Sequence, residues 1–237
     1  MLDGRGWCRV QKTCVIAAGV SHNASLHLWR VGRAASEGVR QMAEQGRAGR
    51  LSGQLPQGFG GVFDVFHGPP IAKGSGASTT TFFADGRHSR VSAMSRLVPS
   101  PDWFVGVDSV ELCEAGRWRD LALADAQLLD AGTDRGLTFT APRWPAKPAD
   151  NVTIITPQWP DHPGASFRYP HLKQLPRIGV FQFRRLRDYA APAAVLADQP
   201  STAGQHAAPA EPSAEPNEPN GTFTDGHGNA AVSNVAM

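Results

Sequence analysis

The sequence predicts a mostly β domain, either a β-sandwich or a β-barrel. Several short β-rich runs are separated by turn-forming residues, which is the pattern of these two architectures. Gly (25) and Pro (19) are frequent among the 237 residues, and that composition favours many turns over long helices. The apolar fraction of 41% can supply the packed core of one domain of ordinary size.

One segment, residues 33–51, has the periodicity of a helix. Ser36 can cap its start, and its apolar residues recur at helical spacing: Ala35, Val39, Met42 and Ala43. Three glycines inside the segment each weaken a helix by up to about 1 kcal/mol. We therefore expect the domain to contain only one or two short helices.

The clearest strand is His88–Val98, in which Val91, Ala93, Ser95 and Leu97 alternate with the residues between them. Asp85-Gly86 and Pro99 bound this run. Pro and Gly also separate four further β-rich runs, which we expect to be strands: Trp103–Val107, Leu137–Thr140, Val152–Thr156 and Ile178–Leu186.

The two ends of the chain differ from the middle. Residues 1–14 show no clear pattern. Residues 190–237 are rich in Ala, Pro, Glu and Ser and almost lack aromatic residues, so they can bury too little apolar surface to offset their chain entropy. We expect a disordered tail over 190–237, whose removal leaves the melting temperature unchanged.

Charge and hydropathy exclude several classes of protein. The formal net charge of +2 is too small to indicate nucleic-acid binding. No apolar stretch approaches the ~20 residues that span a bilayer. The only apolar segment near the start, Val15–Val20, is too short for a convincing signal peptide.

The cysteines and sequons say little about the compartment. Cys8, Cys14 and Cys113 allow at most one internal disulfide and lack zinc-site spacing. Three N-x-S/T triplets, at Asn23, Asn151 and Asn220, give mild support for secretion and glycosylation.

Two longer motifs carry a family resemblance. Residues 98–109 (VPSPDWFVGVDS), followed by Leu112-Cys113, are very similar to the signature of the spondin domain, and residues 130–139 (DAGTDRGLTF) match a second signature at the family's separation. The resemblance covers residues 15–189, and within the mindin and F-spondin family it is nearest to mindin.

The resemblance implies a C2-like antiparallel β-sandwich with a calcium ion bound at Asp102, Asp130 and Asp134. It also implies a secreted, non-enzymatic adhesion module of the extracellular matrix, with a cell-surface receptor (integrin-like) or a matrix component as its partner. In the family, a cysteine that precedes the matching region is joined to the position of Cys113. Here Cys8 or Cys14 could replace it, although their surroundings do not match.

The chemistry of the three aspartates agrees with a calcium site. Calcium prefers carboxylate and carbonyl oxygens, and Gly132 lets the turn between Asp130 and Asp134 bend so that both carboxylates converge. Asp102 follows Pro101 and precedes an apolar strand, which fixes its position. The simpler alternative is that each Asp only forms a turn by hydrogen bonding to its own backbone. Asp108 is left outside the site because we expect it to cap or to face solvent.

The sequence departs from the family at both ends. The first 14 residues differ from the usual leader and first strand, which suggests an alternative start or an incomplete gene model. No cysteine follows Cys113, so we expect no thrombospondin type 1 repeat within these residues. Two other functions stay open: a calcium-dependent lipid-surface module, by analogy with C2 folds, and a metal-assisted hydrolase.

Overall fold

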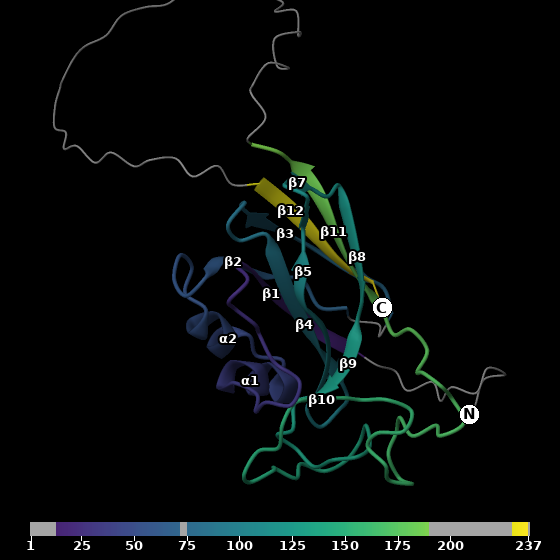
Figure 1. Ribbon diagram of the computed structural model, residues 1–237. Helices are drawn as coiled ribbons and strands as arrows, with labels where there is room; N and C mark the ends of the chain where they lie inside the picture. The colour runs from purple at the N-terminus through teal and green to yellow at the C-terminus, as the bar shows by residue number, and fades with distance from the viewer. Residues whose placement is uncertain (1–12, 72–74, 190–228, 237) are drawn as a thin grey trace, which may run out of the picture.

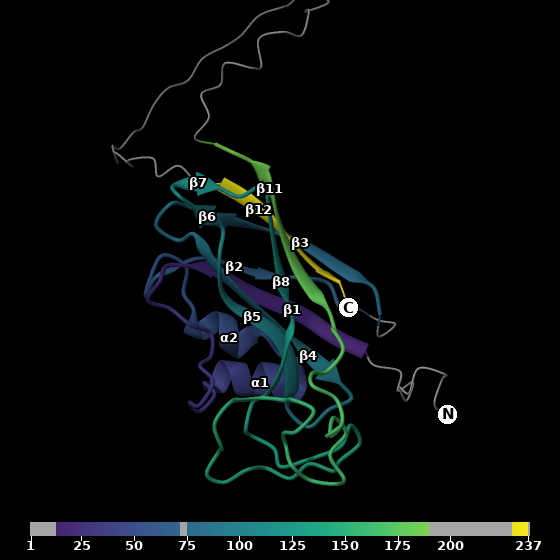
Figure 2. The same cartoon turned by 45° about the vertical axis from the view of Figure 1, so that its right-hand side comes forward.

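The computed structural model describes residues 13–71, 75–189 and 229–236, and in this part of the chain two antiparallel sheets pack face to face with two short helices on one side (Figure 1). Turned by 45°, the molecule shows three layers: the helices, the larger sheet and the smaller sheet (Figure 2). The predicted mostly β sandwich with short helices is confirmed.

The larger sheet has six strands and forms the middle layer. Every neighbouring pair is antiparallel, and the spatial order is β10 (Thr153–Ile154), β9 (Gln127–Asp130), β5 (Trp103–Glu111), β4 (Arg90–Val98), β1 (Thr13–His22) and β2 (Val62–His67). One face of this sheet packs on the helices through Val20, Met94 and Phe104. The opposite face packs on the smaller sheet and on the long loops.

The smaller sheet has four strands, also antiparallel. Their order is β3 (Ala77–Ala84), β12 (Asn229–Ala236), β11 (Val180–Arg187) and β8 (Leu121–Asp125). Phe82, Phe181 and Phe183 are at most 2% exposed and form the core between the sheets with Val91 and Val107. A separate hairpin pairs β6 (Cys113–Glu114) with β7 (Arg117–Trp118).

The predicted helix over 33–51 is present as two shorter helices, α1 (Glu37–Gln45) and α2 (Gly49–Gln54). Ser36 caps α1 as predicted, because its Oγ accepts a hydrogen bond from the Val39 N–H at 3.2 Å. Gly46 then ends α1 in the left-handed region, at φ 68°, where glycine carries no penalty. The predicted apolar positions Val39, Met42 and Ala43 are fully buried.

The structure modifies most of the predicted strands. His88–Val98 is confirmed as β4 with a start at Arg90, Trp103–Val107 extends to Glu111 as β5, and Ile178–Leu186 corresponds to β11. Val152–Thr156 contains only the two-residue β10.

The strand predicted at Leu137–Thr140 is wrong, because these residues lie in a loop. Their apolar pattern has a different cause. The Phe139 ring contacts Trp103 and Phe167 in edge-to-face geometry, with ring centroids 5.3 and 5.2 Å apart. Phe139 therefore anchors the loop on the end of the larger sheet.

The predicted disordered tail is wrong over Asn229–Ala236, because these residues form β12. β12 lies between β3 and β11 and pairs with both. Removal of the tail would expose two strands, so the expectation that the tail is dispensable is not kept. Residues 190–228 and Met237 lie outside the described residues.

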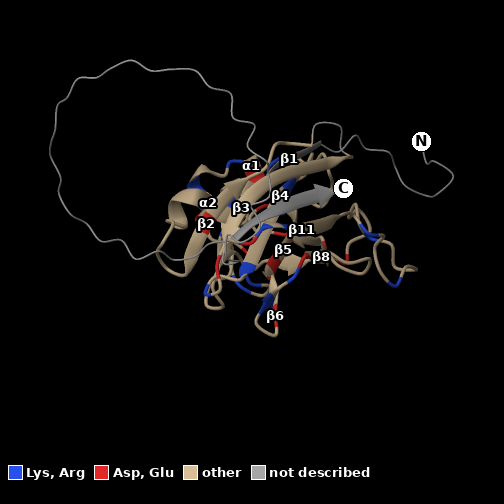
Figure 3. Cartoon of the chain, turned by 90° about the horizontal axis from the view of Figure 1, so that it is seen from above, with Lys and Arg blue, Asp and Glu red and all other residues tan. Residues whose placement is uncertain are grey.

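In the described part of the chain, no helix is long and apolar enough to cross a membrane. Acidic and basic residues are interspersed along strands and loops in the view of Figure 3. Cys113 is half-buried and has no disulfide partner among the described residues. Cys8 lies outside the described residues, and the disulfide between Cys113 and an N-terminal cysteine stays a prediction.

Candidate functional site

Asp102 occupies the turn directly before β5 and is completely buried. Its Oδ2 accepts three hydrogen bonds, from the Thr133 N–H at 2.6 Å, the Thr133 hydroxyl at 3.1 Å and the Asp134 N–H at 3.0 Å. Its Oδ1 is buried and has no hydrogen-bond partner among the residues that the structure describes. One oxygen of this carboxylate is therefore saturated, whereas the other is left for a ligand.

Asp130 is the last residue of β9 and pairs in register with Trp103 at the start of β5. This pairing brings the second aspartate beside the first across two neighbouring strands. Its Oδ1 accepts the Gly132 N–H at 2.7 Å, and its Oδ2 accepts the indole N–H of Trp103 at 3.1 Å. Each carboxylate oxygen has two lone pairs, so both retain capacity for a cation.

Asp134 lies at the end of the same turn and is 7% exposed. Its Oδ1 accepts the Gly136 N–H at 2.9 Å and its Oδ2 accepts the Trp144 N–H at 3.0 Å. The carboxylate thus holds its own turn and also ties a distant loop to it. The predicted turn-forming role and a ligand role are compatible at this residue.

Gly132 permits the turn that joins the two aspartates, as expected. Its φ is +71°, and a Cβ here would lie 2.5 Å from the carbonyl oxygen of Asp150. The Asp150 N–H also donates to the Gly132 carbonyl at 2.7 Å. Only glycine combines this conformation with such a close approach of two backbones.

The three aspartates, which we call the acidic corner, carry poorly compensated charge. Burial raises the pKa of Asp102 to about 7, and the nearby charge of Asp130 raises it as well. Burial also raises the pKa of Asp130 to about 6, with the charges of Asp134 and Asp150 adding to the effect. Like charges that are buried together favour protonation or a bound cation.

The residues of the acidic corner fit a hard cation such as calcium. The orphaned Oδ1 of Asp102, next to Asp130, is an oxygen of the type that calcium prefers. Among the described residues, however, no three acidic, histidine or cysteine side chains already form a metal-binding group. Backbone carbonyls and water would have to complete the shell, and the ligand set Asp102, Asp130 and Asp134 stays a prediction.

Two contributors to the acidic corner could not be expected from the sequence. Thr133 holds Asp102 through both its N–H and its hydroxyl, and Trp103 donates to Asp130 through its indole. Thr133 lies within the second motif, but its role depends on a contact with a residue 31 positions earlier. The second motif contains Thr133, but the sequence does not show that Thr133 contacts Asp102.

Asp108 neither faces solvent nor belongs to the acidic corner. Its Oδ1 accepts the Leu28 N–H and the Ser92 hydroxyl, and its Oδ2 lies 2.6 Å from Nδ1 of His27. His22 is fully buried and contacts the same Ser92 hydroxyl at 2.7 Å. This network joins the loop after β1 to β4 and β5, so we assign it a structural role.

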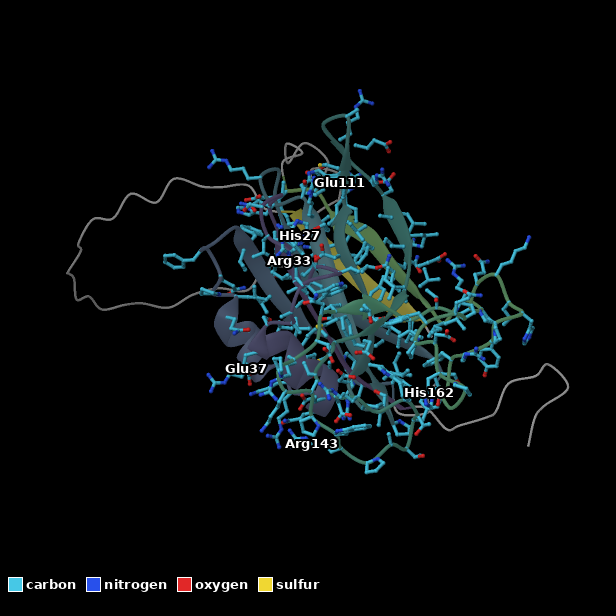
Figure 4. All side chains as sticks on the ribbon, turned by 60° about the horizontal axis from the view of Figure 1, so that its bottom comes forward. His27, Arg33, Glu37, Glu111, Arg143 and His162 are labelled. Carbon is cyan, nitrogen blue, oxygen red and sulfur yellow. The ribbon has the colours of Figure 1, made fainter. Side chains whose placement is uncertain are left out.

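A pocket of about 390 Å³ opens beside Asp134, and its lining includes Glu44, Arg96, Ser100, Pro101 and Arg143. Arg143 lies on the same side of the molecule as Glu37 of α1, with Glu111 at the opposite end (Figure 4). The guanidinium of Arg143 lies 3.5 Å from the carboxylate of Glu44 in α1. The next residue, Trp144, is 60% exposed, so an apolar and a basic side chain flank the acidic corner.

Known proteins resemble this chain over the region just described. The Spondin_N family model matches residues 9–177, which include all three aspartates and end before β11. Spondin-2 from rat and from human are each 42% identical over 172 residues, covering 71% of this chain and 52% of the relative. Spondin-1 from rat is 31% identical over 179 residues, covering 70% of this chain and 22% of the relative. The chain thus spans about half or less of the length of these relatives.

Proposed function

This chain belongs to the spondin family, and from that premise we propose that it is a secreted adhesion module of the extracellular matrix, stabilised by calcium at the acidic corner. The observation that carries the calcium part is the buried Oδ1 of Asp102, which has no hydrogen-bond partner in the described part of the chain. A buried charged oxygen without a partner is costly. A calcium ion shared with Asp130 and Asp134 would remove that cost.

The same corner supports a proposal about the partner of the module. A calcium ion keeps open positions that an acidic group can fill, and the exposed guanidinium of Arg143 attracts the same chemistry. We therefore propose an acidic group on a cell-surface receptor or matrix component as the binding epitope. Asp134 supports this arrangement because it holds the backbone of Trp144, next to Arg143.

We expect calcium to raise the stability of the domain by about 1–3 kcal/mol when it exceeds the dissociation constant ten- to a hundredfold. Extracellular modules bind calcium with dissociation constants on the order of 10⁻⁴–10⁻³ M. Thermal melts in calcium and in chelator measure the effect. The double variant Asp130→Asn and Asp134→Asn should lose it, because an amide lacks the charge that binds the cation.

Asp161→Asn is the matched control for this experiment. Asp161 is an exposed aspartate of the same loop region, and it pairs with Arg168 at 3.0 Å. The Asp161→Asn variant should keep the full increase in melting temperature on addition of calcium. Identical melts of the unmutated domain in calcium and chelator would show that the three aspartates only form turns.

One observation favours a lipid-surface function as the second candidate. Trp144 is exposed directly beside the acidic corner, and exposed indoles bind at membrane interfaces. For the adhesion function we expect the protein to stay in the supernatant after centrifugation with phosphatidylserine vesicles, with or without calcium. Pelleting that needs calcium and is lost in Trp144→Ser would replace the adhesion function by the lipid-surface one. No comparable observation among the described residues favours a hydrolase.

A further inference from the structure

The C-terminal strand β12 occupies the middle of the smaller sheet, between two strands that come much earlier in the chain. It pairs with β3 from Asn229↔Ala84 to Ala236↔Ala77 and with β11 from Val180↔Ala236 to Arg187↔Ala230. Figures 1 and 2 both show it, in yellow, flanked by β3 and β11. The space between β3 and β11, here called the acceptor slot, is therefore one strand wide.

The connection to β12 is unlike that of an ordinary hairpin. Arg187 at the end of β11 pairs with Ala230 near the start of β12, yet residues 188–228 separate the two strands in sequence. Hairpin loops usually contain 2–5 residues. Because the entropic cost of closing a loop rises with its length, this connection favours pairing within one chain less than a tight turn would.

The β3 wall of the acceptor slot is held in place without β12. The Ser21 hydroxyl donates to the Phe83 carbonyl at 2.6 Å, and the Phe83 N–H donates to Asp64 at 2.8 Å. The Thr80 hydroxyl donates to the His67 carbonyl at 2.8 Å. These bonds tie β3 to β1 and β2, so β3 does not depend on β12 for its position.

The β11 wall is held by β8, with five register pairs from Val180↔Asp125 to Arg184↔Leu121. The two walls also meet through their side chains. The rings of Phe82 on β3 and Phe183 on β11 lie 6.2 Å apart, and both residues are at most 2% exposed. Without β12, the slot would have an apolar floor and two unpaired strand edges. Such a slot is a site for strand addition.

We propose that the acceptor slot binds an extended strand that is exchangeable, and that a second copy of this chain supplies it through its own Asn229–Ala236. The same register pairs form whichever copy provides the strand, so exchange costs no backbone pairing. The connection of residues 188–228 is long enough in sequence for the strand to reach a neighbouring copy. Mutual exchange gives a closed two-fold dimer, in which each copy donates and accepts one strand.

The test uses the full-length chain with one cysteine added to each copy at register partners, beside the native Cys8, Cys14 and Cys113. One copy carries Thr79→Cys on β3 and the other carries Asn234→Cys on β12, because Thr79 pairs with Asn234. Paired residues of neighbouring strands lie at a distance that a disulfide can bridge. After mixing and mild oxidation, a disulfide between these two positions in excess of random collision requires that one copy occupies the slot of the other.

Two controls make the result unambiguous. The double variant Thr79→Cys and Asn234→Cys in one chain reports the register of β12 itself. Mixing Thr79→Cys with Leu123→Cys reports random collision, because Leu123 is 60% exposed and lies on β8, which does not adjoin β3. Peptide mapping of the products identifies the linked positions.

We expect the Thr79–Asn234 mixture to give cross-linked dimer well above the collision control, with a yield that rises with protein concentration. Val232→Pro in the donor copy should reduce that yield several-fold, because proline lacks the N–H that a central strand needs. A disulfide in the double variant but none above collision in the mixture would overturn the exchange. If neither the double variant nor the mixture forms the disulfide, Asn229–Ala236 does not occupy the acceptor slot.

Discussion

Replacing Trp103 by Ala is expected to lower the free energy of unfolding by about 3–5 kcal/mol, the range for buried large aromatic residues. Trp103 is 2% exposed, and its ring contacts Phe139 and Phe167 at centroid distances of 5.3 and 5.2 Å. Its loss would leave a cavity under the loops that follow β9. It would also remove the indole N–H that holds Asp130. Urea denaturation followed by circular dichroism measures the change.

Two further substitutions separate packing from the polar contact. Trp103→Phe keeps an aromatic ring but removes the donor to Asp130, so it should cost less stability than Trp103→Ala while it still weakens the calcium response. Trp144→Ala removes a tryptophan that is 60% exposed and should change stability by less than about 0.5 kcal/mol. If Trp103→Ala behaves like Trp144→Ala, the packing around the acidic corner is not as described.

The calcium-free domain is expected to lose stability as the pH rises from 4 to 7. The pKa of Asp102 is raised from 3.8 to about 7 in the folded state, mainly by burial. Above pH 4 the unfolded chain releases this proton freely, whereas the folded state retains it until about pH 7, so the rising pH favours unfolding. A pKa shift of this size corresponds to a decrease in the free energy of unfolding on the order of 4 kcal/mol between pH 4 and 7.

Urea denaturation in chelator between pH 4 and 8 measures this loss, and Asp102→Asn is the reference. His22 works in the opposite direction, since burial lowers its pKa and its contribution to stability is lost as the pH falls. The difference between the unmutated domain and Asp102→Asn cancels the histidine contribution and leaves that of Asp102. Calcium should flatten the slope near neutral pH, because it stabilises the charged carboxylates. Superimposable profiles of the two proteins in chelator would contradict the raised pKa of Asp102.

Features that depend on neighbouring residues could be read from the sequence. The strand β4, the apolar face of α1 and the cap at Ser36 follow from spacing within a few residues, and the structure confirms all three. The two motifs also placed the three aspartates, because each motif is continuous in the chain. The family followed from the same continuous motifs.

Features that depend on distant partners were decided by the tertiary structure alone. Leu137–Thr140 has the composition of a strand, but Phe139 is used to anchor a loop on Trp103. Thr133 gains its role only because β5 and β9 pair in a register that brings Asp102 to it.

The end of the chain shows the same division most clearly. Asn229–Ala236 follows a segment of low apolar content, and its own sequence, NAAVSNVA, has only two β-branched residues, which is too weak a signal to predict a strand. It forms β12 because β3 and β11 leave a slot one strand wide, whose unpaired backbone groups need partners. Local patterns determine the elements that carry their own signal, whereas long-range backbone pairing decides which weak segment becomes part of a sheet.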